Sequence, residues 1–330
     1  MNLRMIFAKF TNMDSQTILL NQVKDRMQSK SLLTELAGVL NISYDAAHRR
    51  ISGKTKLLLD EAIIICQYYN LSPDQLFMPG NRVLAEKTKE IRSAADVVDY
   101  LKQSIGILNA LKHDGPAKIY YSAKDIPLFY TIDDSLLSKF KQYVWLGLLS
   151  GNVGSISFEQ FDVQGPIHEY GKALRDMYGS FEAHEIWNDT TVNSGLQQIY
   201  YYYRAGLLSI ENALTLLNEL EAVLKLVEDR SGVNNGRYNL YYNELLVLNN
   251  NVLVVSTKQK ALFVPYNLLG YFITHDEDTC ANTEVFFNQQ LKHSMPLNTG
   301  SLRDRNQFFN RALQRIKVYR QRMEGDVGLF

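Results

Sequence analysis

The chain has 330 residues, of which 46% are hydrophobic and 21% charged, and its formal net charge at pH 7 is +0. At about 150 residues per domain this length predicts two or three domains, and the composition excludes a disordered chain. The zero net charge excludes binding to nucleic acid through bulk charge, so any contact with DNA requires a local basic surface.

The cysteines and the apolar runs indicate the compartment. Cys66 and Cys280 lie far apart in the sequence, and Cys66 is within an apolar run, which favours free thiols in a reducing cytoplasm over a disulfide. The first ten residues lack the apolar core of a signal peptide, and no run approaches the ~18 apolar residues of a membrane span. We therefore expect a cytoplasmic protein with no membrane partner.

Residues 16–78 have the pattern of short helices separated by polar or capping residues. The predicted helices are Gln16–Met27, Leu32–Leu40, Ser43–Ile51, Leu57–Tyr69 and Pro73–Phe77. Ser43 and Ser72 stand where helix N-caps are needed, and Pro79-Gly80-Asn81 is expected to end the domain.

The segment Leu33–Lys56 is the most informative part of this region. Two helices that cross at a steep angle need a small residue at the crossing, which Ala37 supplies. Asn41 suits a left-handed turn residue, and Ser43 suits the N-cap of the second helix, whose first turn it can aim at a phosphate or a base edge. The segment therefore predicts a helix-turn-helix.

The same segment resembles the Cro/CI-type (XRE-like) helix-turn-helix family of transcriptional regulators. The resemblance rests on Ser43, Ala46 or Ala47, Arg49-Arg50-Ile51, Gly53 and Leu57, and it covers about a fifth of the chain. It implies a five-helix, lambda-repressor-like DNA-binding domain in which the helix that begins at Ser43 enters the major groove of DNA. The whole chain is also similar to one-component regulators of this type with a large uncharacterised C-terminal domain, a similarity that supplies no ligand.

The resemblance gives a set of candidate DNA-binding residues. They are Ser43, Tyr44, Asp45, His48, Arg49, Arg50, Lys54, Lys56 and Lys30. Arginine can bind guanine through two parallel hydrogen bonds, and Arg49 is the favoured base reader. Lys30, Lys54 and Lys56 are placed for phosphates. His48 as a base contact and His48 as a solvated surface residue are alternatives.

Charge and residue order around this helix matter for that assignment. From Lys24 to Lys56 there are seven lysines and arginines against three acidic residues, which leaves a local excess of +4. The family often has an apolar residue where Arg50 falls and a polar one where Ile51 falls. This inversion leaves open which of Arg49 and Arg50 reads bases.

Residues 81–113 are expected to form a helical linker. Ile91, Ala94, Val98, Leu101, Ile105 and Leu108 alternate spacings of three and four over residues 86–112. Such a seam either forms a dimer coiled coil or packs on the C-terminal domain of its own chain.

Residues 114–330 are expected to form an α+β domain with a small antiparallel sheet, so that the protein is mostly α and α+β overall. The predicted strands include 117–122 and 261–264, and 238–248 with 252–256 as a hairpin around Asn249-Asn250-Asn251. Helices are expected at 136–149, 167–178, 192–204, 210–227, 284–293 and 302–323.

This half of the chain carries no catalytic signature, so we expect no enzyme, no cofactor and no metal site. His275-Asp276-Glu277-Asp278 with Cys280 fits a solvated acidic loop better than a metal site, and Glu182, His184, Glu185 and Trp187 have no partner signal. The tyrosines Tyr200–Tyr203, with Tyr241, Tyr242, Phe263 and Tyr266, form either core or the wall of a ligand pocket.

The expected organisation is a DNA-binding domain at 1–80, a helical linker at 81–113 that is a candidate dimerisation helix, and a sensor or oligomerisation domain at 114–330. We expect a sequence-specific regulator that binds a pseudo-palindromic operator in double-stranded DNA as a homodimer. An unknown small-molecule or peptide effector is expected as a partner. The alternative is a protein-interaction module that uses the N-terminal helices without binding DNA.

Overall fold

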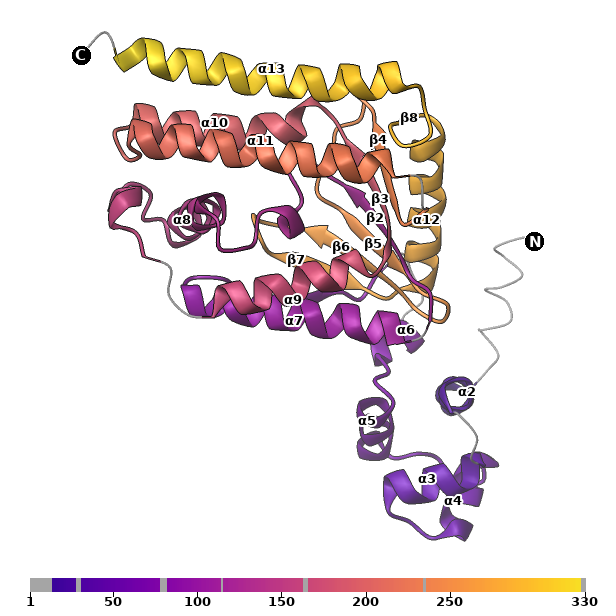
Figure 1. Ribbon diagram of the computed structural model, residues 1–330. Coiled ribbons are helices and arrows are strands. Elements are labelled where there is room, and N and C mark those ends of the chain that lie inside the picture. Colours follow the sequence, from indigo (N-terminus) through magenta and orange to yellow (C-terminus); the bar gives the residue numbers. More distant parts are fainter. Residues whose placement is uncertain are drawn as a thin grey trace. The chain divides into compact units, whose positions relative to one another are not determined.

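The computed structural model describes residues 14–27, 31–77, 82–113, 115–162, 166–233 and 236–327. The chain divides into two compact units, with the division between Leu84 and Ala85 (Figure 1). Residues 85–113, expected to form a linker, therefore belong to the second unit. Within the described residues no helix is long and apolar enough to cross a membrane.

The first unit consists of helices. They are α2 (Ser15–Arg26), α3 (Leu32–Leu40), α4 (Tyr44–Ile51), α5 (Leu59–Tyr68) and α6 (Pro73–Phe77), which lie close to the predicted bounds. The buried core of the unit consists of Leu19, Leu20, Val23, Leu36, Ala37, Ala47, Ile65, Cys66 and Leu71. These residues come from α2 to α5 and from the turn after α5, so the unit has an apolar core of its own.

The turn between α3 and α4 has the predicted chemistry. Asn41 ends α3 in the left-handed conformation with φ 52° and ψ 48°, and the Ile42 amide donates to the Ala37 carbonyl at 3.0 Å. Ser43 caps α4 by accepting from the Ala46 amide at 3.3 Å. A left-handed residue followed at once by an N-cap turns the chain sharply, which fixes the direction of α4 relative to α3.

The second unit is built on one eight-stranded mixed sheet in the order β1-β7-β6-β5-β2-β3-β4-β8. Its strands are β1 (Glu86–Lys87), β2 (Lys118–Ser122), β3 (Glu182–Trp187), β4 (Tyr238–Tyr242), β5 (Val252–Val255), β6 (Lys260–Pro265), β7 (Tyr271–Thr274) and β8 (Met295–Pro296). The pairs β2–β3 and β3–β4 are parallel, with Ile119 opposite Ala183 and Leu240 opposite Glu185, and the other pairs are antiparallel.

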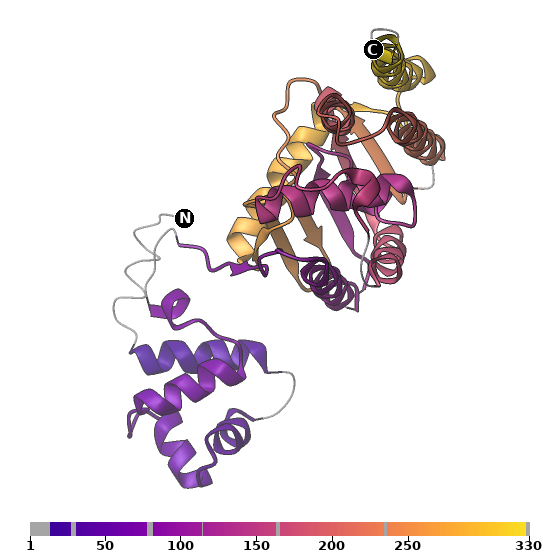
Figure 2. The ribbon, with the colours of Figure 1, turned by 90° about the vertical axis from the view of Figure 1, so that its left-hand side faces the viewer.

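Helices cover both faces of this sheet. They are α7 (Ala94–His113), α8 (Leu136–Ser150), α9 (Ile167–Gly179), α10 (Asp189–Arg204), α11 (Ile210–Gly232), α12 (Glu277–Lys292) and α13 (Leu302–Val327), with short 3-10 turns η1 (Leu128–Tyr130) and η2 (Phe158–Gln160). In Figure 2, α12 lies on one side of the sheet and the bundle of the other helices on the opposite side. Along β2, Ile119 and Tyr121 join the large core under that bundle, whereas Tyr120 joins the smaller core under α12.

Two expectations for this half of the chain are wrong. The sheet is not small and antiparallel, because β2, β3 and β4 run parallel and are connected through helices α8 to α11. The hairpin around the three asparagines does not exist either. The strand β4 pairs with β3 and β8, whereas β5 pairs with β2 and β6. Asn250 does take a positive φ of 61°, but its side chain accepts from the Lys124 amide at 2.8 Å and so holds the end of β2.

The apolar seam at residues 91–108 packs within the second unit. Leu101 and Leu108 on α7 are buried in the large core, together with Leu174 from α9. Of the two readings of this seam, the fold has the one in which the helix packs on its own chain. The segment before Ala94 is not helical and includes strand β1.

Replacing Leu101 with alanine should therefore weaken the second unit itself. The expected loss is about 2–5 kcal/mol in the free energy of unfolding, the usual cost of a cavity in a core. The exposed Asn109 on the same helix gives the matched control Asn109→Ala, expected within about 0.5 kcal/mol of the parent. The measurement is denaturant unfolding followed by fluorescence of Trp145 and Trp187, both in the second unit. A change of oligomeric mass without a loss of stability in Leu101→Ala would contradict this account of α7.

Candidate nucleic-acid interface

Helix α4 is fixed to the first unit by few of its residues. Ala47 is its one fully buried side chain and lies in the core of the unit. Because alanine is small, α4 can lie close to α3. The other side chains of α4 are exposed or only partly buried.

Arg50 forms the strongest side-chain contact of α4. Its Nη2 lies 2.6 Å from Oε1 of Glu61 on α5, and its Nε donates to the two carboxylate oxygens at 2.9 and 2.8 Å. Only 15% of the Arg50 side chain and 13% of the Glu61 side chain are exposed. The hydrogen bonds from Arg50 hold the pKa of Glu61 below its ordinary value. Such a forked pair fixes direction as well as distance, so Arg50 sets the rotation of α4 about its own axis.

A buried glutamine holds the loop that follows α4. Gln16 on α2 donates through Nε2 to the carbonyls of Arg50 at 2.5 Å and Thr55 at 3.2 Å. Its Oε1 accepts from the Leu57 amide at 2.8 Å. Gly53, within this loop, takes a φ of 75°, which favours glycine. The loop that carries Lys54 is thus tied at both ends to the first helix.

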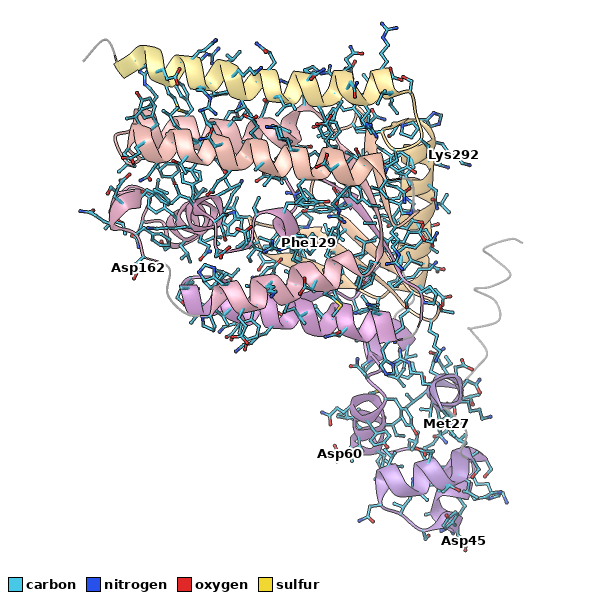
Figure 3. All side chains as sticks on the ribbon, viewed as in Figure 1. Met27, Asp45, Asp60, Phe129, Asp162 and Lys292 are labelled. Atoms are coloured by element: carbon cyan, nitrogen blue, oxygen red, sulfur yellow. The ribbon has the colours of Figure 1, made fainter. Side chains whose placement is uncertain are left out.

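With Arg50 turned inward, the outward face of α4 carries most of the other predicted residues. Ser43, Tyr44, Asp45, His48 and Arg49 are all exposed, and 58% of Tyr44 is open to solvent. The labelled Asp45 marks this helix in Figure 3. The spacings of Tyr44 to His48 and of Asp45 to Arg49 are four residues each, so these side chains form one surface strip. Arg49, and not Arg50, belongs to this strip.

Some basic residues around α4 are bonded to other groups of the protein, and others have no ion pair with the described residues. Besides Arg50, Arg26 donates to the Tyr69 and Asn70 carbonyls at 2.6 and 2.7 Å, and Lys56 lies 2.5 Å from an Asp14 carboxylate oxygen. Lys24, Arg49 and Lys54 have no ion pair with any residue in the described ranges. Lys30 lies outside the described residues. Acidic partners therefore neutralise Arg50 and Lys56, whereas Arg49 and Lys54 keep charges that no described residue pairs.

Sequence reasoning missed Glu61 and Gln16, the two residues that hold this surface in place. Gln16 lies in register with Leu19, Leu20 and Val23 on the buried face of α2. A polar side chain at an apolar position of a helix was a signal that could have identified it. Glu61 gave no comparable signal, because its partner is eleven residues away on another helix.

The helix α5 exposes an apolar row. The exposed fractions are 77% for Leu59, 42% for Ile63, 43% for Ile64 and 64% for Tyr68, and the preceding Leu58 is 63% exposed. Grouped apolar exposure of this kind is typical of a surface that contacts another protein. It is separate from the polar strip of α4.

The weaker candidates of the C-terminal half have structural roles. His275 bonds through Nδ1 with the Lys260 carbonyl at 3.0 Å, Asp276 caps α12 by accepting from the Thr279 amide at 2.9 Å, and Cys280 is buried. Among the residues placed by the structure, no cluster of histidine, cysteine and acidic side chains could hold a metal ion.

Glu185 is the centre of a buried polar network. Its carboxylate accepts from the Tyr130 hydroxyl at 2.8 Å, the Trp187 indole at 2.8 Å and the Tyr238 hydroxyl at 3.2 Å, and also from Tyr178. Burial raises the pKa of Glu185, and the hydrogen bonds from Tyr178, Tyr130 and Trp187 oppose that shift. These donors come from η1, β3, β4 and α9, so the network fastens helices to the sheet.

The tyrosine groups singled out in the sequence mostly serve as core. Tyr202 packs on Phe140 and Tyr143, and Tyr200 packs edge-on against Tyr319 with ring centres 5.6 Å apart. Two members of that group line pockets of the second unit: Phe263 lines one beside α7, and Tyr202 lines another beside α8.

Loss of the Glu61 carboxylate should loosen α4. At neutral pH, Glu61→Gln is expected to lower the local stability of α4 and α5 by about 1–3 kcal/mol, because Arg50 loses a charged partner. A carboxyl whose pKa is lowered on folding stabilises the fold above its ordinary value of 4.5 and loses that contribution as the pH falls. The difference between parent and variant should therefore shrink below a pH of about 4.5.

The measurement is hydrogen exchange of the amides of residues 44–68 in the full chain. The exposed neighbour on the same helix gives the control Asp60→Asn, which should leave exchange nearly unchanged. Equal exchange rates for the parent and Glu61→Gln at pH 7 would show that the pair does not hold α4.

Comparison of the chain with protein-family models, with curated proteins and with solved structures finds no match in any of the three.

Proposed function

We propose that the first unit binds double-stranded DNA through α4 and that the protein is a sequence-specific transcriptional regulator. The observation that carries this proposal is that some side chains of α4 hold the helix in place while others stay exposed. Ala47 and Arg50 hold the helix, while Tyr44, His48 and Arg49 remain exposed along one strip. A short, rigidly held helix with a polar outward strip fits the major groove, which admits one α-helix.

Arg49 is the proposed base reader. Within the described ranges it has no ion pair, so its guanidinium is available to bind guanine through two parallel hydrogen bonds. Lys54 follows α4 on the loop that Gln16 holds, and it is proposed to contact a phosphate. Ser43 and the first amides of α4 add a second phosphate-binding element, because the N-terminus of a helix attracts anions.

A dimer is proposed because one unit of this size contacts little DNA. The seam on α7 is buried within its own chain and is not proposed as the dimer contact. The exposed apolar row on α5 is the surface of the first unit that suits a second copy. A two-fold pair of units requires a pseudo-palindromic operator with half-sites about 10 base pairs apart, or a multiple of that spacing.

The same apolar row supports the alternative, a protein-interaction module that does not bind DNA. The two proposals differ in their response to salt. DNA binding through lysine and arginine weakens steeply as salt rises, whereas contact through an apolar row does not. Retention on immobilised DNA that is lost as salt rises favours the regulator, and retention of a protein partner with no affinity for DNA favours the module.

Arg49→Ala should weaken binding to a duplex selected from a random pool by about tenfold or more, the loss expected for one base contact. Lys54→Ala should weaken binding to all sequences and reduce the slope of log affinity against log salt by about 1. Arg303→Ala removes an exposed arginine from the second unit and is the matched control, which should bind like the parent. Fluorescence anisotropy of labelled duplexes measures these affinities. Unchanged affinity in both Arg49→Ala and Lys54→Ala would reject the proposal.

Leu59→Glu should abolish the pairing of two chains on DNA, because it would bury a charge in the apolar contact between their α5 helices. The variant is expected to bind a single half-site with unchanged affinity and to lose the tighter binding of the full operator. Asn109→Glu, which adds the same charge on an exposed face of the second unit, is the control. Sedimentation of the complexes gives their stoichiometry, and a complex of Leu59→Glu that still holds two chains per operator would contradict the α5 dimer.

A further inference from the structure

A cavity lies inside the second unit between α7 and the sheet. Its walls come from α7, from β2, β5, β6 and β7, and from η1 and α9 beside them. Its volume is about 70 Å³, well above the ~10–15 Å³ that one water molecule requires. Protein interiors are otherwise close-packed, so this space is room that side chains of the core leave unfilled.

The walls are aromatic and aliphatic. Five rings line the cavity, those of Tyr100, Tyr121, Phe129, Phe263 and Tyr271. No charged side chain among the described residues lines it. Phe129, labelled in Figure 3, stacks on Tyr178 with ring centres 3.9 Å apart, which fixes its ring as a wall. An apolar lining of this kind favours apolar ligands and opposes charged ones, which would lose their hydration without gaining a partner.

A few hydroxyl groups give the cavity a polar side. Tyr100, Tyr121 and Tyr271 carry hydroxyl groups, and Thr88, Gln103 and Ser104 add polar side chains to the lining. Burial raises the pKa of Tyr271 to about 12 and raises the pKa of Tyr100 further, so these phenols are uncharged at neutral pH. They can donate or accept one hydrogen bond each, which suits a ligand with a single hydroxyl or carbonyl group.

The cavity borders the first residues of the second unit. Thr88 lines it and is fastened to β7, because its amide donates to the Tyr271 carbonyl at 3.0 Å and its Oγ1 accepts from the Tyr271 amide at 2.9 Å. Thr88 is four residues from the division between the two units. A ligand that moves Tyr271 or Tyr100 would therefore act directly on the segment that follows the first unit.

We infer that this cavity binds a small, uncharged and mainly apolar molecule with one hydrogen-bonding group, and that its occupant regulates the first unit. The inference of regulation rests on the proposed function, whereas the inference of ligand binding does not. A quaternary ammonium ion, which aromatic cages also bind, is disfavoured here because no carboxylate from the described part of the chain lines the cavity.

The test uses phenol as the probe, with toluene, benzoate and tetramethylammonium for comparison. Titration calorimetry on the full chain should give saturable binding of phenol, weaker binding of toluene and no binding of the two ions. Binding of benzoate or tetramethylammonium as tight as that of phenol, or no saturable binding of either phenol or toluene, would overturn the inference.

Two kinds of variant locate the site. Ile107→Phe fills the cavity from α7 and should weaken phenol and toluene alike by about tenfold or more. Asn109→Phe, on the exposed face of the same helix, is the matched control. Tyr271→Phe and Tyr100→Phe keep the ring and remove the hydroxyl, so at least one of them should lower the preference for phenol over toluene. Phenol binding that is the same in Ile107→Phe and Asn109→Phe would place the ligand elsewhere and overturn the assignment to this cavity.

Regulation is tested by measuring the affinity for the selected duplex with and without saturating phenol. A change of about fivefold or more supports the regulatory half, and an unchanged affinity overturns it. The calorimetry contains no DNA, so failure of the first unit to bind DNA leaves the ligand result intact and is recognised separately.

Discussion

The forked ion pair between Arg50 and Glu61 determines which side of α4 faces the solvent. Both side chains are largely enclosed, and three nitrogen–oxygen contacts of 2.6 to 2.9 Å join them. A rotation of α4 by one residue would replace this contact with Arg49 and would turn Arg50 outward. The pair therefore selects Arg49 for the surface, a choice that the order of residues along the chain left open. Gln16 adds the second constraint by holding the loop that carries Lys54.

The two units of the chain differ in the size of their cores and in how they are stabilised. The first is small, with a core of alanine, valine, leucine and isoleucine side chains and Cys66, and polar contacts of Arg50 and Gln16 add to this core. The second buries both faces of a sheet, and it can keep a cavity because its core is far larger. We propose that the first unit recognises DNA through exposed side chains and that the second holds a ligand between neutral aromatic walls.

The sequence predicted the first unit well because its signals are local. Asn41 and Ser43 specify a turn within three residues, and the apolar spacing of each helix is complete within that helix. The sheet was mispredicted because its order depends on contacts between distant segments. Two runs on either side of Asn249-Asn250-Asn251 have the pattern of a hairpin, but β4 and β5 lie on opposite sides of the parallel pair β2–β3. The cavity could not be foreseen for the same reason, since Tyr100 on α7 meets Tyr121 and Tyr271 only when that helix packs on the folded sheet.

The proposed function requires that α4 is the surface of the first unit that contacts DNA. Hydrogen–deuterium exchange of the full chain, with and without its selected duplex, locates that surface directly. We expect protection to concentrate at residues 43–56, which include α4 and the loop with Lys54. Protection confined to α5, or no change at residues 43–56 under conditions of saturating duplex, would contradict the account.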